Sequence, residues 1–236
     1  MCRDKGRLLR KSRCIPPELH RPYTSAKNRF PLTLKRTALE HAYGIVILAA
    51  GTSSRLGRPK QLLQYKGDSL LNNTIQTAQQ ANPAAIVVVL GAEAEKLVRE
   101  IRSPDVAVIL NTGFREGMAS SIRCGVQHMM DHQDKVTHII LMVCDQPHVD
   151  TSHILSLIAK QQHTGAEITA SFYADRKGVP ALFHRSVFPE LLALTGDTGA
   201  RGIIEKHGTG TALVPFPAGA VDIDTDEGYR ELTGNE

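Results

Sequence analysis

Apolar and polar positions alternate in blocks from residue 44 onward, and the blocks predict alternating strands and helices. Continuously apolar runs, several of them rich in β-branched residues, predict buried strands at 44–50, 85–91, 106–110 and 137–144. Apolar residues at helical spacing predict helices at 69–81, 94–101, 118–130 and 151–162, the last capped by Thr151 or Ser152. Strands that are apolar on both faces and alternate with helices indicate a mainly parallel sheet between helical layers.

The pattern is weaker after about residue 165, and it shows no internal repeat. We expect shorter strands near 167–173 and 211–216, and helices near 186–194 and 200–206. The chain from residue 44 to residue 236 is therefore expected to form one three-layer α/β/α domain. Ligands of open α/β sheets bind at the carboxyl ends of the strands. The site is expected in the loops 51–60, 111–121 and 144–148.

Charge separates the first 43 residues from the rest of the chain. They hold 11 Lys and Arg against 3 Asp and Glu, whereas the remaining residues hold 17 against 21. We interpret residues 1–43 as a basic, disordered extension, with a nucleic-acid arm or a targeting peptide as alternatives. No run of residues approaches the length of a membrane helix, and no signal peptide precedes the domain. The four cysteines lack metal-binding spacing, and Cys144 is expected to be a buried thiol, so we expect a cytoplasmic location.

The loop after the first predicted strand is suited to binding phosphate. The stretch GIVILAAGTSSRLGRPKQLL, residues 44–63, passes from a buried strand into glycines and positive charges. Gly51 and Gly57 allow backbone N–H groups to point at an anion, and Arg55, Arg58 and Lys60 add charge. The spacing fits neither the dinucleotide fingerprint G-x-G-x-x-G nor the phosphate loop G-x-x-x-x-G-K-S/T.

Two groups of carboxylates are candidate metal ligands. Asp145 follows the fourth predicted strand at the same sheet edge as the phosphate loop, and a carboxylate beside bound phosphate calls for a divalent cation. Asp222 and Asp224 lie in VDIDTDEGYREL, residues 221–232, and on a strand they would face the same side. Asp145 as a turn cap, and Asp224 or Thr225 as the cap of a last helix, are the alternatives.

The motif L-A-A-G-x-S-x-R-x-G-x-P-K at residues 48–60 resembles the signature of nucleotidyltransferases with a Rossmann-like, glycosyltransferase-A-like fold. The resemblance implies that the loop wraps a nucleoside triphosphate and that Lys60 contacts its phosphates. The contacts it implies in this loop are Leu48, Ala49, Ala50, Gly51, Ser53, Arg55 and Lys60. Of these, Arg55 and Lys60 are assigned with Asp145 to catalysis.

Two further stretches extend the resemblance. Residues 111–126 are similar to N-x-x-W/F-x-x-G-M-x-x-S-L/I-x-x-G, which implies contacts from Gly117 and Ser121 to the nucleotide, although alone they predict only an ordinary helix start. Residues 221–232 resemble an ending D-T-P-E-D-L/Y, with Asp226 where proline is usual and Gly228 where aspartate is usual. This alignment favours Asp224 over Asp222 as the second ligand of Mg²⁺.

Residues 178–207 resemble the molybdenum cofactor cytidylyltransferases and other MobA-like NTP transferases, in which G-x-P-A/V-L-F and G-D-x-G-A-R recur. The resemblance implies transfer of CMP from CTP to the phosphate of molybdopterin. Residues 172–180 and the side chains of Asp197 and Arg201 would lie near that acceptor, unless residues 196–199 form only a helix-capping turn. His148 is expected to be a surface or supporting residue, because an ionised phosphate needs no general base.

Other functions stay open on these motifs. GTP is possible in place of CTP, and a sugar- or alcohol-phosphate acceptor could share the first loop. A non-catalytic nucleotide- or nucleic-acid-binding protein is the alternative from another class. Chaperones that mature molybdoenzymes are possible partners, whereas neither a membrane nor nucleic acid is expected as a partner.

Deleting residues 1–40 is expected to leave nucleotide transfer and thermal stability nearly unchanged, because no apolar pattern there could dock on the domain. Thermal unfolding and a pyrophosphate-release assay on the truncated chain check this expectation. A large loss of either would show that the extension is part of the domain, and a selective loss of nucleic-acid binding would favour the binding-protein alternative.

Overall fold

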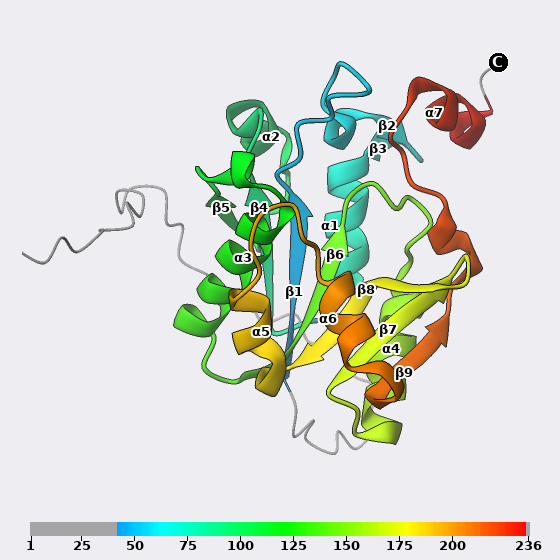
Figure 1. The fold of residues 1–236 in the computed structure, drawn as a ribbon. Coiled ribbons are helices and arrows are strands. Elements are labelled where there is room, and N and C mark those ends of the chain that lie inside the picture. Colours follow the sequence, from blue (N-terminus) through cyan, green and yellow to red (C-terminus); the bar gives the residue numbers. More distant parts are fainter. Residues whose placement is uncertain (1–41, 235–236) are drawn as a thin grey trace, which may run out of the picture. The chain divides into compact units, whose positions relative to one another are not determined.

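A seven-stranded sheet forms the centre of the fold in the computed structural model, which describes residues 42–234 (Figure 1). The strand order is β5-β4-β1-β6-β8-β7-β9. The strands are β1 (Ala42–Ala49), β4 (Ala85–Leu90), β5 (Ala107–Leu110), β6 (Val136–Val143), β7 (Ile168–Tyr173), β8 (Arg176–His184) and β9 (Thr211–Pro215). The predicted α/β class with a mainly parallel sheet is confirmed. The predicted basic extension, apart from its last two residues, lies outside the described residues.

Helices cover both faces of the sheet, because successive apolar side chains of β1 point to opposite faces and both sets have to be buried. Ile45 and Ile47 pack in one core with α1 (Leu70–Gln80), α2 (Ala94–Glu100) and α4 (Thr151–Thr164). Val46 packs in the opposite core with α3 (Met118–His132), α5 (Phe188–Leu192) and α6 (Arg201–Lys206). No helix among residues 42–234 is long and apolar enough to cross a membrane.

Strand β8 departs from the predicted pattern. It lies between β6 and β7 and is antiparallel to both, whereas no strand was expected at 176–184. The strand begins with the charged residues Arg176 and Lys177, which interrupt the apolar pattern in the sequence. Ala181 and Phe183, further along the strand, are fully buried in the interior of the sheet. Residues 178–183, with the sequence GVPALF, are therefore part of the core. Residues 172–180 form a hairpin between β7 and β8.

The cap of α4 also differs from the prediction. Asp150, rather than Thr151 or Ser152, is the N-cap, and its Oδ1 accepts a hydrogen bond from the backbone N–H of His153 at 2.8 Å. Asp150 has an extended backbone conformation, and its carboxylate is an acceptor for the free N–H groups of the first turn. The last helix, α7 (Asp226–Thr233), begins after Thr225, which caps it through the N–H of Gly228 at 3.2 Å.

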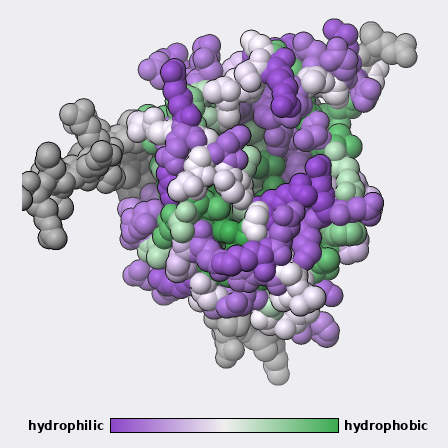
Figure 2. Space-filling model, viewed as in Figure 1, coloured by the Kyte–Doolittle hydropathy of each residue, from purple (hydrophilic) through white to green (hydrophobic). Residues whose placement is uncertain are grey.

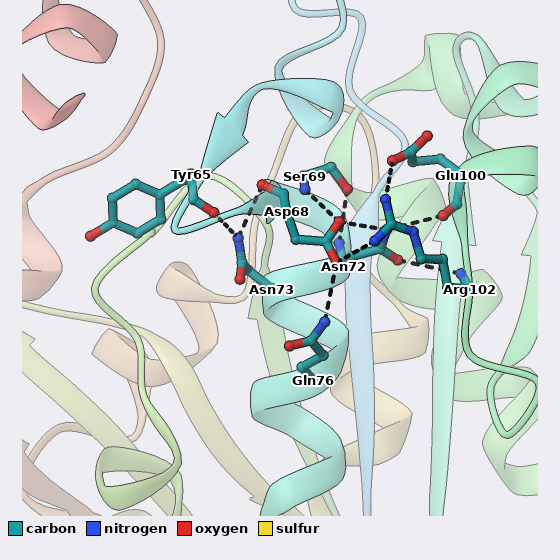
Figure 3. Close-up of polar contacts among 8 residues, drawn as sticks. All are labelled: Tyr65, Asp68, Ser69, Asn72, Asn73, Gln76, Glu100 and Arg102. Atoms are coloured by element: carbon teal, nitrogen blue, oxygen red, sulfur yellow. Dashed lines mark hydrogen bonds and ion pairs between the residues drawn. The ribbon is translucent and has the colours of Figure 1, made fainter. Parts of the chain in front are cut away.

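A buried polar network fixes the chain between the first loop and α1 (Figure 3). The hairpin of β2 (Gln64–Tyr65) and β3 (Asp68–Ser69) leads directly into α1. The nearly buried Asp68 carboxylate accepts hydrogen bonds from Ser69 N–H, Asn72, Gln76 and Arg102. Burial alone would raise the pKa of Asp68, but these donors hold it below its usual value. The network anchors the end of the loop that carries the candidate phosphate-binding residues.

Candidate active site

The loop between β1 and a 3₁₀ turn (Lys60–Leu62) is held in shape by its own polar groups. Gln61 is buried, and its Nε2 donates to the carbonyls of Ala49 at 3.0 Å and Gly51 at 3.1 Å. Ser53 Oγ accepts from the backbone N–H of Lys60 at 3.0 Å. Ser53 and Gly57 have φ of 52° and 68°, which let the chain reverse within the loop. The loop is thereby closed at its base, and Lys60 is aimed inward.

Lys60 joins the two carboxylates that the sequence singled out as metal ligands. Its Nζ donates to Asp145 Oδ2 at 2.6 Å and to Asp224 Oδ1 at 2.8 Å. The Lys60 side chain is 14% exposed, against 23% for Asp145 and 41% for Asp224. Three segments far apart in sequence thus meet at the carboxyl edge of the sheet.

The opposite charges of Lys60, Asp145 and Asp224, which we call the triad, stabilise one another. Burial alone would lower the pKa of Lys60, but the attraction of Asp145 and hydrogen bonds to Asp145 and Asp224 raise it above its ordinary value. The hydrogen bond from Lys60 lowers the pKa of Asp224 below its usual value, against the effect of partial burial. The Lys60–Asp224 pair is therefore ionised at neutral pH. Burial raises the pKa of the neighbouring Cys144 thiol to about 12, so this predicted buried thiol is protonated and unreactive.

The segment with Asp222 and Asp224 is not a strand, so the two carboxylates do not share a strand face. It is joined to the end of β6 by one backbone hydrogen bond, from Ile223 N–H to Asp145 O at 3.0 Å. Ile223 is fully buried, and Asp224 contacts Lys60 and Arg55, whereas Asp222 is exposed. The structure thus brings Asp224, the favoured residue, to Asp145.

A cavity of about 570 Å³ opens beside this triad. Figure 2 shows that face of the molecule, with hydrophilic residues around a hollow near its centre. The predicted site residues that line the cavity are Leu48, Ala50, Gly51, Lys60, Gly117, Ser121, Asp145 and Asp197. Binding cavities for small molecules commonly enclose about 300–1,000 Å³, so a nucleotide is of suitable size.

Other predicted residues lie outside the cavity lining. Ala49 is buried in the core on the opposite side of β1, and Ser53 supports the loop from within. Arg55 is paired with Asp224 at 3.3 Å. Arg201 lies on α6 and is paired with Glu205 at 2.7 Å, one turn along the same helix. The contacts predicted for these side chains stay predictions.

The wall opposite Lys60 is the start of α3, which is capped from a distant turn. Asp197 Oδ1 accepts from Met118 N–H at 3.3 Å, and Gly196 O accepts from Ala119 N–H at 3.2 Å. The turn at 196–199 was considered as a cap of the helix that follows it, but Gly196 and Asp197 instead cap α3. Inside α3, Ser121 Oγ accepts from Asn111 Nδ2 at 3.0 Å.

Sequence reasoning missed several lining or supporting residues. Gln61 is not among the residues predicted from the motifs, and of the cavity residues Phe114, Arg115 and Glu116 only Phe114 falls on a defined position of the motif at 111–126. Glu116 is held by Arg123 Nη2 at 2.7 and 2.8 Å. A signal for the aromatic wall existed in the W/F position of the motif, whereas no local pattern marks Arg115 or Glu116 as lining residues.

The Gly117→Ala substitution is expected to destabilise the fold by about 1–3 kcal/mol, because Gly117 adopts a conformation that only glycine takes without strain. Its φ is 118°, and an added Cβ would lie 2.5 Å from Gly196 O. The matched control is Gly202→Ala in α6, where a Cβ meets nothing within 4 Å. That control is expected to stabilise by up to about 1 kcal/mol. Chemical denaturation measures both, and equal behaviour of the two variants would contradict this account of the Gly117–Gly196 contact.

The donor set fits a magnesium ion that is also bound by substrate. Asp145 and Asp224 supply carboxylate oxygens, and Mg²⁺ is usually held by one or two carboxylates together with substrate phosphates. The part of the chain that the structure describes holds no group of three or more His, Cys, Asp or Glu side chains arranged for a metal. The pair therefore suits an ion that arrives with a triphosphate better than a permanently bound one.

Fold, loop and cavity together define a nucleotide-transferring protein, and a model of the MobA-like NTP transferase domain matches residues 45–211. The chain belongs to the MobA-like NTP transferase family, which confirms the predicted family and its α/β nucleotidyltransferase fold.

Individual relatives agree on this fold and carry diverse names. Nicotine blue oxidoreductase of Paenarthrobacter nicotinovorans is 29% identical over 68% of this chain and 80% of its own. Purine catabolism protein PucB of Bacillus subtilis is 28% identical over 78% of this chain and 92% of its own. Among solved structures, Rv0371c of Mycobacterium tuberculosis is 31% identical, with a TM-score of 0.71 over 83% of this chain and 99% of that one. Another structure of Rv0371c, 28% identical with a TM-score of 0.68 over 83% of this chain and 100% of that one, is a complex with manganese.

Proposed function

We propose that this protein transfers CMP from CTP to the phosphate of molybdopterin or its molybdenum-loaded form, and releases pyrophosphate. The observation that carries the proposal is the meeting of Lys60, Asp145 and Asp224 beside the cavity that Gly51 lines. Membership of the family supports a nucleotidyltransferase. The choice of CTP and of a molybdopterin acceptor rests on the stretches at 178–207 that resemble cytidylyltransferases.

The proposed reaction is an in-line displacement at phosphorus. An oxygen of the acceptor phosphate forms a bond to the α-phosphorus of the nucleotide, and the bond from that phosphorus to the bridging oxygen of pyrophosphate breaks. The acceptor phosphate is already ionised near neutral pH, so no proton has to be removed before attack. The protein contributes position and charge, which are the main sources of rate enhancement in phosphoryl chemistry.

Lys60 acts on the leaving group in this proposal. Its ammonium group neutralises negative charge that develops on the leaving pyrophosphate, and its contacts to Asp145 and Asp224 hold it ready for that role. The N–H groups of the glycine loop bind the phosphates, and Arg55 adds charge nearby. Asp145 and Asp224 would hold Mg²⁺, which would neutralise the triphosphate and orient it. Manganese bound to Rv0371c supports a divalent cation in this family.

The cavity wall formed by Gly117, Ser121 and the 3₁₀ turn Phe114–Glu116 would receive the nucleoside, since it lies across the cavity from Lys60. Asp197 lines the same cavity and would contact the acceptor in this proposal, and Arg201 would reach an acceptor phosphate only by leaving Glu205. Both acceptor assignments depend on the identity of the acceptor. The proposal includes a role for chaperones of molybdoenzyme maturation only as possible partners in delivery of the product.

A panel of the four nucleoside triphosphates, each with molybdenum-loaded molybdopterin and Mg²⁺, tests the proposal through pyrophosphate release. Release with CTP supports it, and release with GTP alone would identify a guanylyltransferase. Release with a sugar or alcohol phosphate in place of molybdopterin would identify that compound as the acceptor. Tight nucleotide binding without release would indicate a binding protein. Oxidation or reduction of nicotine blue without any release would favour the activity that the name of nicotine blue oxidoreductase describes.

A further inference from the structure

The C-terminal segment packs on the nucleotide loop through a small cluster separate from the two main cores. Ile223 is fully buried against Leu56, Leu63 and Leu70. In Figure 1, α7 lies beside the β2–β3 hairpin, and Tyr229 of α7 donates to Gln64 O at 2.8 Å. This segment lies beyond the residues 45–211 that the family model matches.

Arg58 of the loop is held by two residues of α7. Its Nη2 lies 2.7 Å from Asp226 Oδ1, and its guanidinium carbon lies 5.7 Å from the centre of the Tyr229 ring. Arg58 does not line the cavity, in contrast to Lys60, which lies two residues further along the loop. We name these three residues, Arg58, Asp226 and Tyr229, the loop latch.

We propose that Asp226 is a positioning residue, which through Arg58 keeps the loop at 53–60 in its nucleotide-binding shape before the nucleotide arrives. The loop reverses through Ser53 and Gly57, and ordering such a segment costs conformational entropy. A contact that orders it in the free protein removes that cost from binding. The inference rests on the proposed function only in taking the ligand of this loop to be a triphosphate.

Stability alone does not account for the latch. The Arg58 and Asp226 side chains are 55% and 46% exposed, and exposed ion pairs contribute little to global stability. Asp226 also stands where the motif that this ending resembles has proline, and a proline could not pair with Arg58. The latch is thus a feature of this chain, placed on the loop that carries Arg55, Arg58 and Lys60.

Asp226 lies at a position of α7 where it can be replaced without loss of the helix. It is the first residue of α7, where proline is well tolerated, and Thr225 caps the helix independently. The variants Asp226→Asn and Asp226→Pro therefore remove the carboxylate while α7 still forms. The matched control is Glu93→Gln, which breaks the exposed Lys96–Glu93 ion pair (Nζ–Oε2 2.5 Å), neither residue of which lines the cavity.

Hydrogen exchange of the nucleotide-free, full-length chain is the first measurement. Both Asp226 variants are expected to exchange faster at residues 53–60, whereas Glu93→Gln should match the wild type there. Calorimetry with magnesium tripolyphosphate, a probe that carries no base, is the second measurement. Its affinity is expected to fall about 2- to 5-fold in both Asp226 variants. Unchanged exchange and affinity would overturn the proposal.

A charge swap separates positioning from direct phosphate contact. In the double variant Arg58→Asp with Asp226→Arg the ion pair can form again, so protection of residues 53–60 in the nucleotide-free protein should recover at least half of the loss seen in Asp226→Asn. No recovery of this protection would overturn the latch. Failure of the wild type to release pyrophosphate would refute the proposed function while leaving the exchange result on the latch intact.

Discussion

Asp145→Asn is expected to abolish metal-dependent transfer while the protein remains folded. Asparagine keeps the shape of the side chain but removes the negative charge, so one of the two carboxylates proposed to hold Mg²⁺ is lost. Asp145 also accepts from Lys60 Nζ at 2.6 Å, and its replacement leaves that ammonium shared only with Asp224. Nucleotide binding without metal should therefore persist or tighten, because a carboxylate that repels phosphate has gone.

The measurement is pyrophosphate release against magnesium concentration for the wild type and the variant. Asp150→Asn is the matched control, because Asp150 is a carboxylate that caps α4, where asparagine is a good replacement. If Asp145 were likewise only a cap, the two variants would behave alike. An unchanged magnesium dependence with a near-normal maximum rate would refute the assignment of Asp145 as a metal ligand. Asp224→Asn should act in the same direction, and less severely if Asp222 can take its place.

Lys60→Ala is expected to lower the rate of transfer by about 30- to 1,000-fold, which corresponds to about 2–4 kcal/mol of transition-state stabilisation. The ammonium group is the charge closest to both site carboxylates, and its removal also leaves Asp145 and Asp224 facing each other without a cation. Secondary structure by circular dichroism should barely change, because Gln61 and Ser53 hold the loop through other groups.

Lys96→Ala provides the comparison for loss of a lysine, since Lys96 of α2 is exposed and forms an ion pair with Glu93, the residue before the helix. That variant should retain the wild-type rate. Wild-type turnover in Lys60→Ala would remove the role in triphosphate binding from this residue, whereas a folded protein with the expected loss in rate would support it.

Local patterns in the sequence were enough for the parallel strands from β1 to β6, for the helices between them and for one half of the site. Residues 85–90 are apolar on both faces because β4 lies inside a sheet covered by two helical layers, and such runs predict parallel strands. The glycine and lysine spacing of residues 51–60 likewise encodes a loop that binds phosphate, because the backbone geometry it requires is local. Asp145 followed from its place at the end of an apolar strand.

Only the tertiary structure decided which distant residues complete that site. Asp224 reaches Lys60 across 164 residues, and Asp197 caps Met118 across 79 residues. These contacts depend on how β8 enters the sheet as an antiparallel strand and on where α7 packs, and neither follows from the periodicity of a segment taken alone. The spacing of apolar residues shows which face of a helix or strand is buried. The partner of each polar side chain is set by how whole helices and strands pack together.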